Sequence, residues 1–97
     1  MSSVKQRLRT GGPPLAGSDP VGYTWDVDHT QHVVYRGGDG RIHELWFNGV
    51  WNYNDLTAAA GNPPLAAGKP TGYTWNIDRT EHVVYRRVDN HIQELYL

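Results

Sequence analysis

The 97-residue sequence contains no cysteine, so it offers neither a disulfide framework nor a thiolate metal site. An excess of one charge is missing as well, because nine Lys and Arg oppose ten Asp and Glu, for a formal net charge of −1 at pH 7. Without a basic stripe to meet phosphate groups, the composition argues against nucleic acid as a partner. Folding is compatible with a reducing or an oxidising compartment, and localisation stays open.

Long hydrophobic runs are also missing. No stretch of about 18 apolar residues occurs, and residues 1–10 carry Lys5, Arg7 and Arg9 without the apolar segment of a secretion signal. We therefore expect a soluble protein without membrane insertion. Aromatic side chains are plentiful instead, with four Trp and six Tyr. In so short a chain they suit either a β core or a sugar site.

Most of the sequence is written twice, at an offset of 63 − 13 = 50 residues between Pro13 and Pro63. Comparing positions 11–47 with the second copy gives 21 identities over 37 positions. The strings Gly-Tyr-Thr-Trp and His-Val-Val-Tyr-Arg both return unchanged. A repeat of this length predicts a chain built from two equivalent structural units.

Each unit has the pattern of β-strands. Alternating or β-branched segments at 23–28, 32–36, 41–47 and 50–57 are separated by Gly-, Pro- and Asn-rich turns. The three alanines that follow add at most a helical turn. We expect an all-β chain of four-stranded antiparallel meanders, each the size of a β-propeller blade.

An Asp-Gly pair at residues 39–40 favours a two-residue type I′ hairpin turn. That turn sets the register of the flanking strands so that Tyr35 faces Glu44. The sequence therefore predicts a contact between Tyr35 and Glu44, repeated between Tyr85 and Glu94.

The two units are unequal in length. Residues 11–60 form blade repeat 1, whereas residues 61–97 form blade repeat 2 with only three strands. Residues 1–10 stand at the phase of the missing fourth strand. Because an open strand edge invites pairing, we expect this N-terminal strand to complete a blade of a neighbouring chain.

Two blades cannot close a ring, since propellers have about four to eight. A head-to-tail homo-oligomer is therefore expected, in which a trimer with six blades is favoured and a tetramer with eight is possible. The alternative is a monomer with a free N-terminal leader.

The string Gly-Tyr-x-Trp, His-Val-Val-Tyr-Arg-Gly-x-Asp-Gly-x-Ile-His-Glu-Leu-Trp, followed by Trp51, residues 54–57 and residues 59–61, resembles the repeat of the PLL-like bacterial β-propeller lectins. The resemblance covers nearly all of residues 11–97. It implies propeller blades with pockets between them that bind fucose or O-methylated sugars. Members of that family have seven blades; with two repeats, this chain is more similar to the two-bladed bacterial fucose lectins that assemble as trimers.

A saccharide site needs an aromatic face for the sugar ring, and planar donors and acceptors for paired hydroxyls. The candidate ligand-binding residues are Trp25, Tyr35, Arg36, Glu44, Trp46, Trp51, Trp75, Tyr85, Arg86, Glu94 and Tyr96. Packing between blades competes as the role of the tryptophans at 25 and 75. Each Arg-Glu pair, 36 with 44 and 86 with 94, alternatively joins neighbouring sheets by charge.

His32 and His82 recur at one spacing beside valines, which predicts hydrogen-bonded structural histidines. The other histidines differ between the copies, so no metal site and no cofactor are expected. The repeated carboxylates come without a nucleophile and base at recognisable spacing, which argues against an enzyme.

The function predicted from the sequence is a multivalent carbohydrate-binding lectin. The alternatives are a structural propeller without a ligand, including an engineered or truncated fragment of a longer ring, and a hydrolase that uses Glu44 or Glu94.

Overall fold

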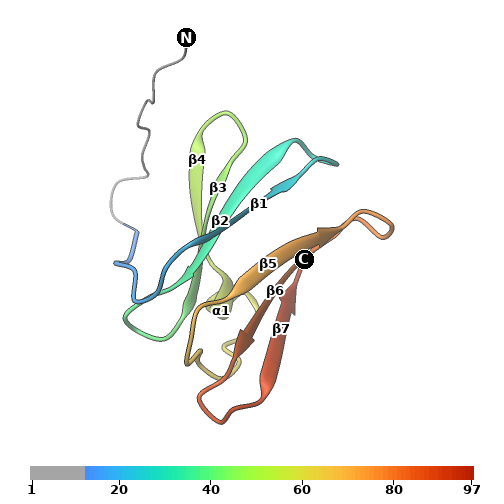
Figure 1. Cartoon of the computed structure of the whole chain (residues 1–97). Helices are drawn as coiled ribbons and strands as arrows, with labels where there is room; N and C mark the ends of the chain where they lie inside the picture. The colour runs from blue at the N-terminus through green and yellow to red at the C-terminus, as the bar shows by residue number, and fades with distance from the viewer. Residues whose placement is uncertain (1–12) are drawn as a thin grey trace.

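The computed structural model describes residues 13–97, so the N-terminal strand predicted at residues 1–10 lies outside the described part. Figure 1 shows two antiparallel sheets that follow one another along the chain. The first holds β1 (Val21–Trp25), β2 (Thr30–Arg36), β3 (Ile42–Phe47) and β4 (Trp51–Asp55), and the second holds β5 (Thr71–Trp75), β6 (Thr80–Arg86) and β7 (Ile92–Tyr96). A single helical turn, α1 (Leu56–Ala59), follows β4. The all-β prediction is confirmed, with consecutive strands side by side in each sheet.

Strand pairing is the same in both sheets at the 50-residue offset. Tyr23 lies opposite His32 where β1 meets β2, and Tyr73 lies opposite His82 where β5 meets β6. The two copies of the sequence therefore fold into matching sheets. Within residues 13–97, no helix is long and apolar enough to cross a membrane.

The hairpin between β2 and β3 differs from the prediction. The Gly37 N–H donates to the Arg41 carbonyl at 2.9 Å, which leaves a three-residue loop, and Gly40 at its end has φ 80°. In the second sheet Asn90 takes this place with φ 72°. A type I turn followed by one left-handed residue is a common three-residue loop, and Asn tolerates that conformation. The prediction of a two-residue type I′ turn is therefore wrong.

The longer loop shifts the strand register by one residue. Tyr35 lies opposite His43, and Glu44 lies opposite Val34. Since neighbouring residues of a strand point to opposite faces, this shift puts Tyr35 and Glu44 on different faces of the sheet. The predicted contact between Tyr35 and Glu44 is therefore wrong, and its copy at residues 85 and 94 is wrong for the same reason.

The fourth strand is shorter than predicted. It ends at Asp55, whose carboxylate accepts a hydrogen bond from the Ala58 N–H at 3.0 Å and so caps α1. The Thr57 hydroxyl then accepts from the Ile42 N–H at 2.7 Å, which fastens the helical turn to the start of β3. The segment predicted as strand to residue 57 thus leaves the sheet to meet the second half of the chain.

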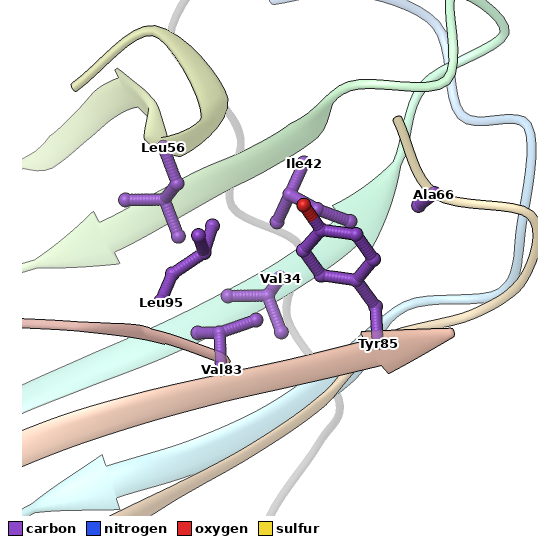
Figure 2. Close-up of a cluster of buried hydrophobic side chains, with 7 residues drawn as sticks. All are labelled: Val34, Ile42, Leu56, Ala66, Val83, Tyr85 and Leu95. Atoms are coloured by element: carbon purple, nitrogen blue, oxygen red, sulfur yellow. The ribbon is translucent and has the colours of Figure 1, made fainter. Parts of the chain in front are cut away.

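The hydrophobic core lies between the two sheets and belongs to both. Its buried members are Val34, Ile42, Leu56, Ala66, Val83, Tyr85 and Leu95. Figure 2 shows side chains of β2 and β3 pointing towards those of β6, with Leu56 of α1 beside Leu95 of β7. Each sheet therefore depends on the other to bury its apolar face.

Candidate functional site

A row of three rings crosses the first sheet on the face that meets the second. Tyr23, His32 and Trp46 are direct neighbours on β1, β2 and β3. The Tyr23 and His32 rings are stacked with centroids 5.1 Å apart, and His32 and Trp46 are stacked at 6.5 Å. Trp25 adds a tilted ring 6.3 Å from His32. A buried imidazole is therefore held between aromatic faces.

Hydrogen bonds through Thr30 determine the protonation of His32 Nε2. The Thr30 hydroxyl donates to a carboxylate oxygen of Asp28, and it lies 2.6 Å from His32 Nε2. Because the hydroxyl proton is directed at Asp28, Thr30 accepts from His32, and Nε2 carries the hydrogen. The other ring nitrogen, Nδ1, then faces the rest of the site.

Two carboxylates from different sheets converge on His32 Nδ1. Glu44 of β3 lies 2.7 Å away and Glu81 of β6 lies 3.2 Å away. The Tyr23 hydroxyl donates to the same oxygen of Glu81 at 2.8 Å. All these side chains but Tyr23 are buried, so the cluster joins the two sheets through charged hydrogen bonds.

The bond between His32 Nδ1 and Glu44 needs a proton in addition to the one on Nε2, and the raised pKa of His32 assigns that proton to the ring. With Nε2 already protonated, a bond from Nδ1 to Glu44 makes the ring an imidazolium. Burial lowers the pKa of His32, but the hydrogen bond to Glu44 and the charge of Glu81 outweigh burial and raise the pKa above its ordinary value. With both carboxylates ionised, the three groups carry a net charge of −1.

Burial raises the pKa of acidic groups, whereas it lowers the pKa of histidine. It raises the pKa of Glu81, and the nearby charge of Glu44 raises it further. Burial also raises the pKa of Tyr23 far above its ordinary value, with the two glutamates adding to the effect, so its hydroxyl stays a donor.

A hollow of about 180 Å³ opens beside this cluster between the sheets. Its lining combines one aromatic ring with carboxylates, an imidazole and an amide, from Asp28, His32, Glu44, Trp46, Asn54, Glu81 and Leu97. Ligand pockets for drug-sized molecules measure roughly 300–1,000 Å³. The hollow therefore suits one small polar ring.

A larger hollow of about 270 Å³ lies beside the edge of β7. Its lining is almost wholly aliphatic, from Leu56, Ala59, Ala60, Leu95, Tyr96 and Leu97. Tyr96 supplies its only polar side chain, which is too few groups to orient a sugar.

The His32 cluster is also the place where a metal ion would have ligands. One ligand atom each from His32, Glu44 and Glu81 lies within 4.8 Å of the others, an arrangement that the sequence did not lead us to expect. At 2.7 Å, however, the distance from His32 Nδ1 to Glu44 is that of a hydrogen bond. These groups are bonded to one another.

The second sheet carries a copy of this site with one side open. Tyr73, His82 and Tyr96 form the same row, with centroid distances of 4.9 Å and 6.2 Å. His82 Nε2 lies 2.6 Å from the Thr80 hydroxyl, and His82 Nδ1 lies 2.9 Å from Glu94. No third strand layer covers this face within the described chain, and Tyr73 and Tyr96 are 45% and 69% exposed.

The structure divides the predicted site residues into three groups. Around His32 lie Trp25, Glu44 and Trp46. The equivalent positions of the second sheet hold Trp75, Glu94 and Tyr96. The remaining predicted residues lie away from both histidines: Tyr35, Arg36, Trp51, Tyr85 and Arg86.

Residues of the third group have structural contacts. The Tyr35 and Tyr85 hydroxyls donate at 2.7 Å to the carbonyls of Pro14 and Pro64, which fastens the Gly- and Pro-rich loops. Trp51 packs on Phe47, 5.3 Å between centroids, on the opposite face of the first sheet.

The arginines do not pair with the glutamates as the charge-pair alternative supposed. Arg36 donates to the Gly17 and Gly37 carbonyls, at 2.8 Å and 3.4 Å. Arg86 donates to the Asn90 side chain at 2.7 Å. Both arginines therefore stabilise the loops at the far end of the strands.

The set predicted from sequence missed the centre of the site. His32 and His82 are hydrogen-bonded, as predicted, but they are also the groups on which the other polar side chains converge. One sequence signal pointed there: Asp28, Thr30 and His32 alternate, so the end of the turn and the strand place them on one side. Glu81 had no such signal, because its counterpart in the first copy is Gln31.

No protein-family model matches this chain, and no curated protein has a significantly similar sequence. The site must therefore be interpreted from its own chemistry.

Proposed function

We propose that this chain is a subunit of a multivalent carbohydrate-binding protein, a lectin whose matching sheets are blades of a β-propeller completed by further copies. The observation that carries the proposal is the hollow between the sheets, where Trp46 stands beside buried carboxylates and the Asn54 amide. A sugar ring has one apolar face and several hydroxyls, so it is matched by an aromatic ring together with fixed polar groups.

Further donors and acceptors support the same ligand class. The indole N–H of Trp25 is buried and has no hydrogen-bond partner within residues 13–97, and its ring lies 6.3 Å from His32. Buried polar groups normally have partners, so a ligand hydroxyl is a suitable acceptor. The sequence resemblance to propeller lectins makes fucose and O-methylated fucosides the first ligands to test.

We propose binding without chemical turnover. Glycoside hydrolysis requires two carboxyl groups on either side of the bond that is cleaved. Here Glu44 and Glu81 converge on the same nitrogen of His32. An imidazolium that occupies the space between the two carboxylates gives them a structural role. Activity on aryl glycosides that is lost in Glu44→Gln would contradict this proposal and indicate a hydrolase.

The test is calorimetric titration of the assembled protein with L-fucose and O-methyl fucosides. A chelator is present so that binding does not depend on a metal ion at the His32 cluster. Trp46→Ala is expected to weaken binding at least about tenfold, which corresponds to roughly 1.4 kcal/mol. Val50→Ala is the control, since this side chain is 64% exposed in the turn between β3 and β4 and does not line the hollow. Equal loss in both variants would count against the hollow as the site.

The competing function is a structural propeller without a ligand of its own. It is favoured by the observation that His32, Glu44 and Glu81 are already bonded to one another. An intact oligomer that binds no sugar on a glycan array would establish it over the lectin.

A further inference from the structure

The face of the second sheet that carries His82 is a copy of a face that is covered in the first sheet. Large side chains project from it, with Trp75 50% exposed, Ile92 70% and Tyr96 69%. Their counterparts Trp25, Ile42 and Trp46 are half-buried or buried beneath β5 to β7. Residues 13–97 thus show this face once covered by another sheet and once exposed.

Two residues of the second sheet, Gly72 and Glu81, contact Tyr23 of the first. A Cβ atom added to Gly72 on β5 would stand 2.3 Å from Cε1 of Tyr23, so the tyrosine ring lies directly over this glycine. Its hydroxyl continues to Glu81 on β6. Gly72 lies opposite Val83, and Glu81 is two residues before Val83 on β6, so a glycine and a nearby acceptor together hold the tyrosine ring.

The first sheet carries the same glycine position on its other face, where no residue from 13 to 97 covers it. At the 50-residue offset Gly22 corresponds to Gly72 and Gln31 to Glu81, and both are exposed. A Cβ at Gly22 would meet only the His32 carbonyl, at an ordinary 3.7 Å, and its φ lies outside the left-handed region. Within the described chain nothing requires glycine at this position.

We propose that Tyr73 of one copy lies over Gly22 of a second copy and bonds to Gln31 of that copy. The exposed face of β5 to β7 then packs on the exposed face of β1 to β4, in a head-to-tail contact between different surfaces. This inference rests on the proposed oligomer and specifies how its copies meet. It also makes the site around His82 incomplete in a single chain.

The two kinds of site would differ in charge. The site within a chain has two glutamates around His32, whereas the site between chains has Glu94 and a neutral amide around His82. Around the histidine the second site has one negative charge fewer. A ring of copies would therefore alternate between an acidic and a less acidic version of one pocket.

The mass of the assembly tests the proposed contact between Tyr73 of one copy and Gly22 of another. Light scattering of the full chain at micromolar concentration is expected to give a multiple of the 10.9 kDa chain mass. Gly22→Val should reduce it to the chain mass while the near-ultraviolet circular dichroism of a folded chain remains. Gly38→Val is the matched control, because its counterpart is already Val88 and no atom lies within 4 Å of its added Cβ.

Cross-linking tests which surfaces meet. Since the chain has no cysteine, Gln31→Cys and Tyr96→Cys each introduce a single thiol. A short thiol-to-thiol reagent should join the two variants when they are mixed, and neither variant to itself. Self-linking of either variant would indicate a symmetric contact and overturn the proposal.

The outcomes separate this inference from the proposed function. An oligomer that fails to cross-link, or that survives Gly22→Val unchanged, overturns the contact and leaves sugar binding untouched. A monomeric wild-type chain overturns the contact together with the proposed assembly. A cross-linked oligomer that binds no sugar supports the contact and refutes the lectin.

Discussion

The hydroxyl of Tyr23 donates a hydrogen bond of 2.8 Å to Glu81, 58 residues further along the chain and in the other sheet. The bond ends in a cluster that also contains His32 and Glu44, so the first strand of one sheet is tied to the second strand of the other. Its energetic weight follows from burial, because a buried carboxylate that loses a donor loses part of its solvation.

Tyr23→Phe is expected to lower the free energy of unfolding by roughly 1–3 kcal/mol, the usual cost of an incompletely satisfied buried acceptor. Urea denaturation at one fixed chain concentration measures it. A double-mutant cycle with Glu81→Ala should give non-additive effects, since alanine cannot accept the hydrogen bond from Tyr23. Additive losses would show that the hydrogen bond is not what Tyr23 contributes.

The pKa of His32 should fall when either carboxylate is neutralised. Glu44→Gln replaces the charged acceptor of the Nδ1 hydrogen bond with a neutral one, and Glu81→Gln removes a charge 3.2 Å from Nδ1. Imidazole chemical shifts followed by NMR over pH 5–9 would measure the change. A His32 pKa that is the same in wild type and both variants would contradict the imidazolium assignment.

Stability is expected to be greatest in mildly acidic solution. The pKa values of His32 and Glu81 are raised in the folded chain, so stability falls as pH rises through them. The His91 N–H bond holds the pKa of Asp89 at about 2, so the stability that this carboxylate adds is present above its unfolded pKa and is lost as pH falls towards 2. Thermal unfolding across pH 2–9 should show a maximum near about pH 4–6; a maximum above pH 8 would refute it.

Gly40 and Asn90, the left-handed residues of the two hairpin loops, should differ in how substitution changes stability. Gly40→Val forces a β-branched residue to φ 80° and brings its Cβ to 3.3 Å from Leu65, at a cost of about 1–2 kcal/mol or more. Asn90→Gly relieves the same conformation and should leave stability within about 0.5 kcal/mol of wild type or raise it. Equal effects, read from urea midpoints, would be inconsistent with the three-residue loop.

The shared core predicts that both sheets unfold together. Leu95→Ala removes a side chain that is 5% exposed and should cost about 2–5 kcal/mol, while Leu15→Ala at an 87% exposed position should stay within about 0.5 kcal/mol. Scanning calorimetry should show one transition in both variants. Two separate transitions after Leu95→Ala would mean that the first sheet is stable without the second.

Sequence reasoning reached the strands more securely than their register. The repeat and the alternating residues predicted the existence of all seven described strands, because side-chain alternation and turn residues are local signals. The bounds of the first strand were wrong, since β1 ends at Trp25 and residues 26–28, predicted as strand, form a turn. The register failed at Gly40, since Asp-Gly fits both a two-residue loop and the end of a three-residue loop. One residue of slip moved Glu44 from the Tyr35 face to the His32 face.

The site was predictable only in part for the same reason. Trp25, Glu44 and Trp46 were named from residue type alone, and they do lie around His32. Tyr35 and Arg36 were named on the same grounds, but they stabilise loops. Residue type does not say which face a side chain occupies, and that depends on the register.

The sequence by itself determined that this chain consists of two matching antiparallel units, because a 50-residue repeat of strand patterns is encoded locally. Only the tertiary structure decided that Glu81 of the second unit completes the site of the first, because that contact depends on how two sheets pack. Their packing buries an apolar core and leaves His32 between two carboxylates. The same packing leaves Gly22 and Tyr73 exposed at the two ends of the arrangement.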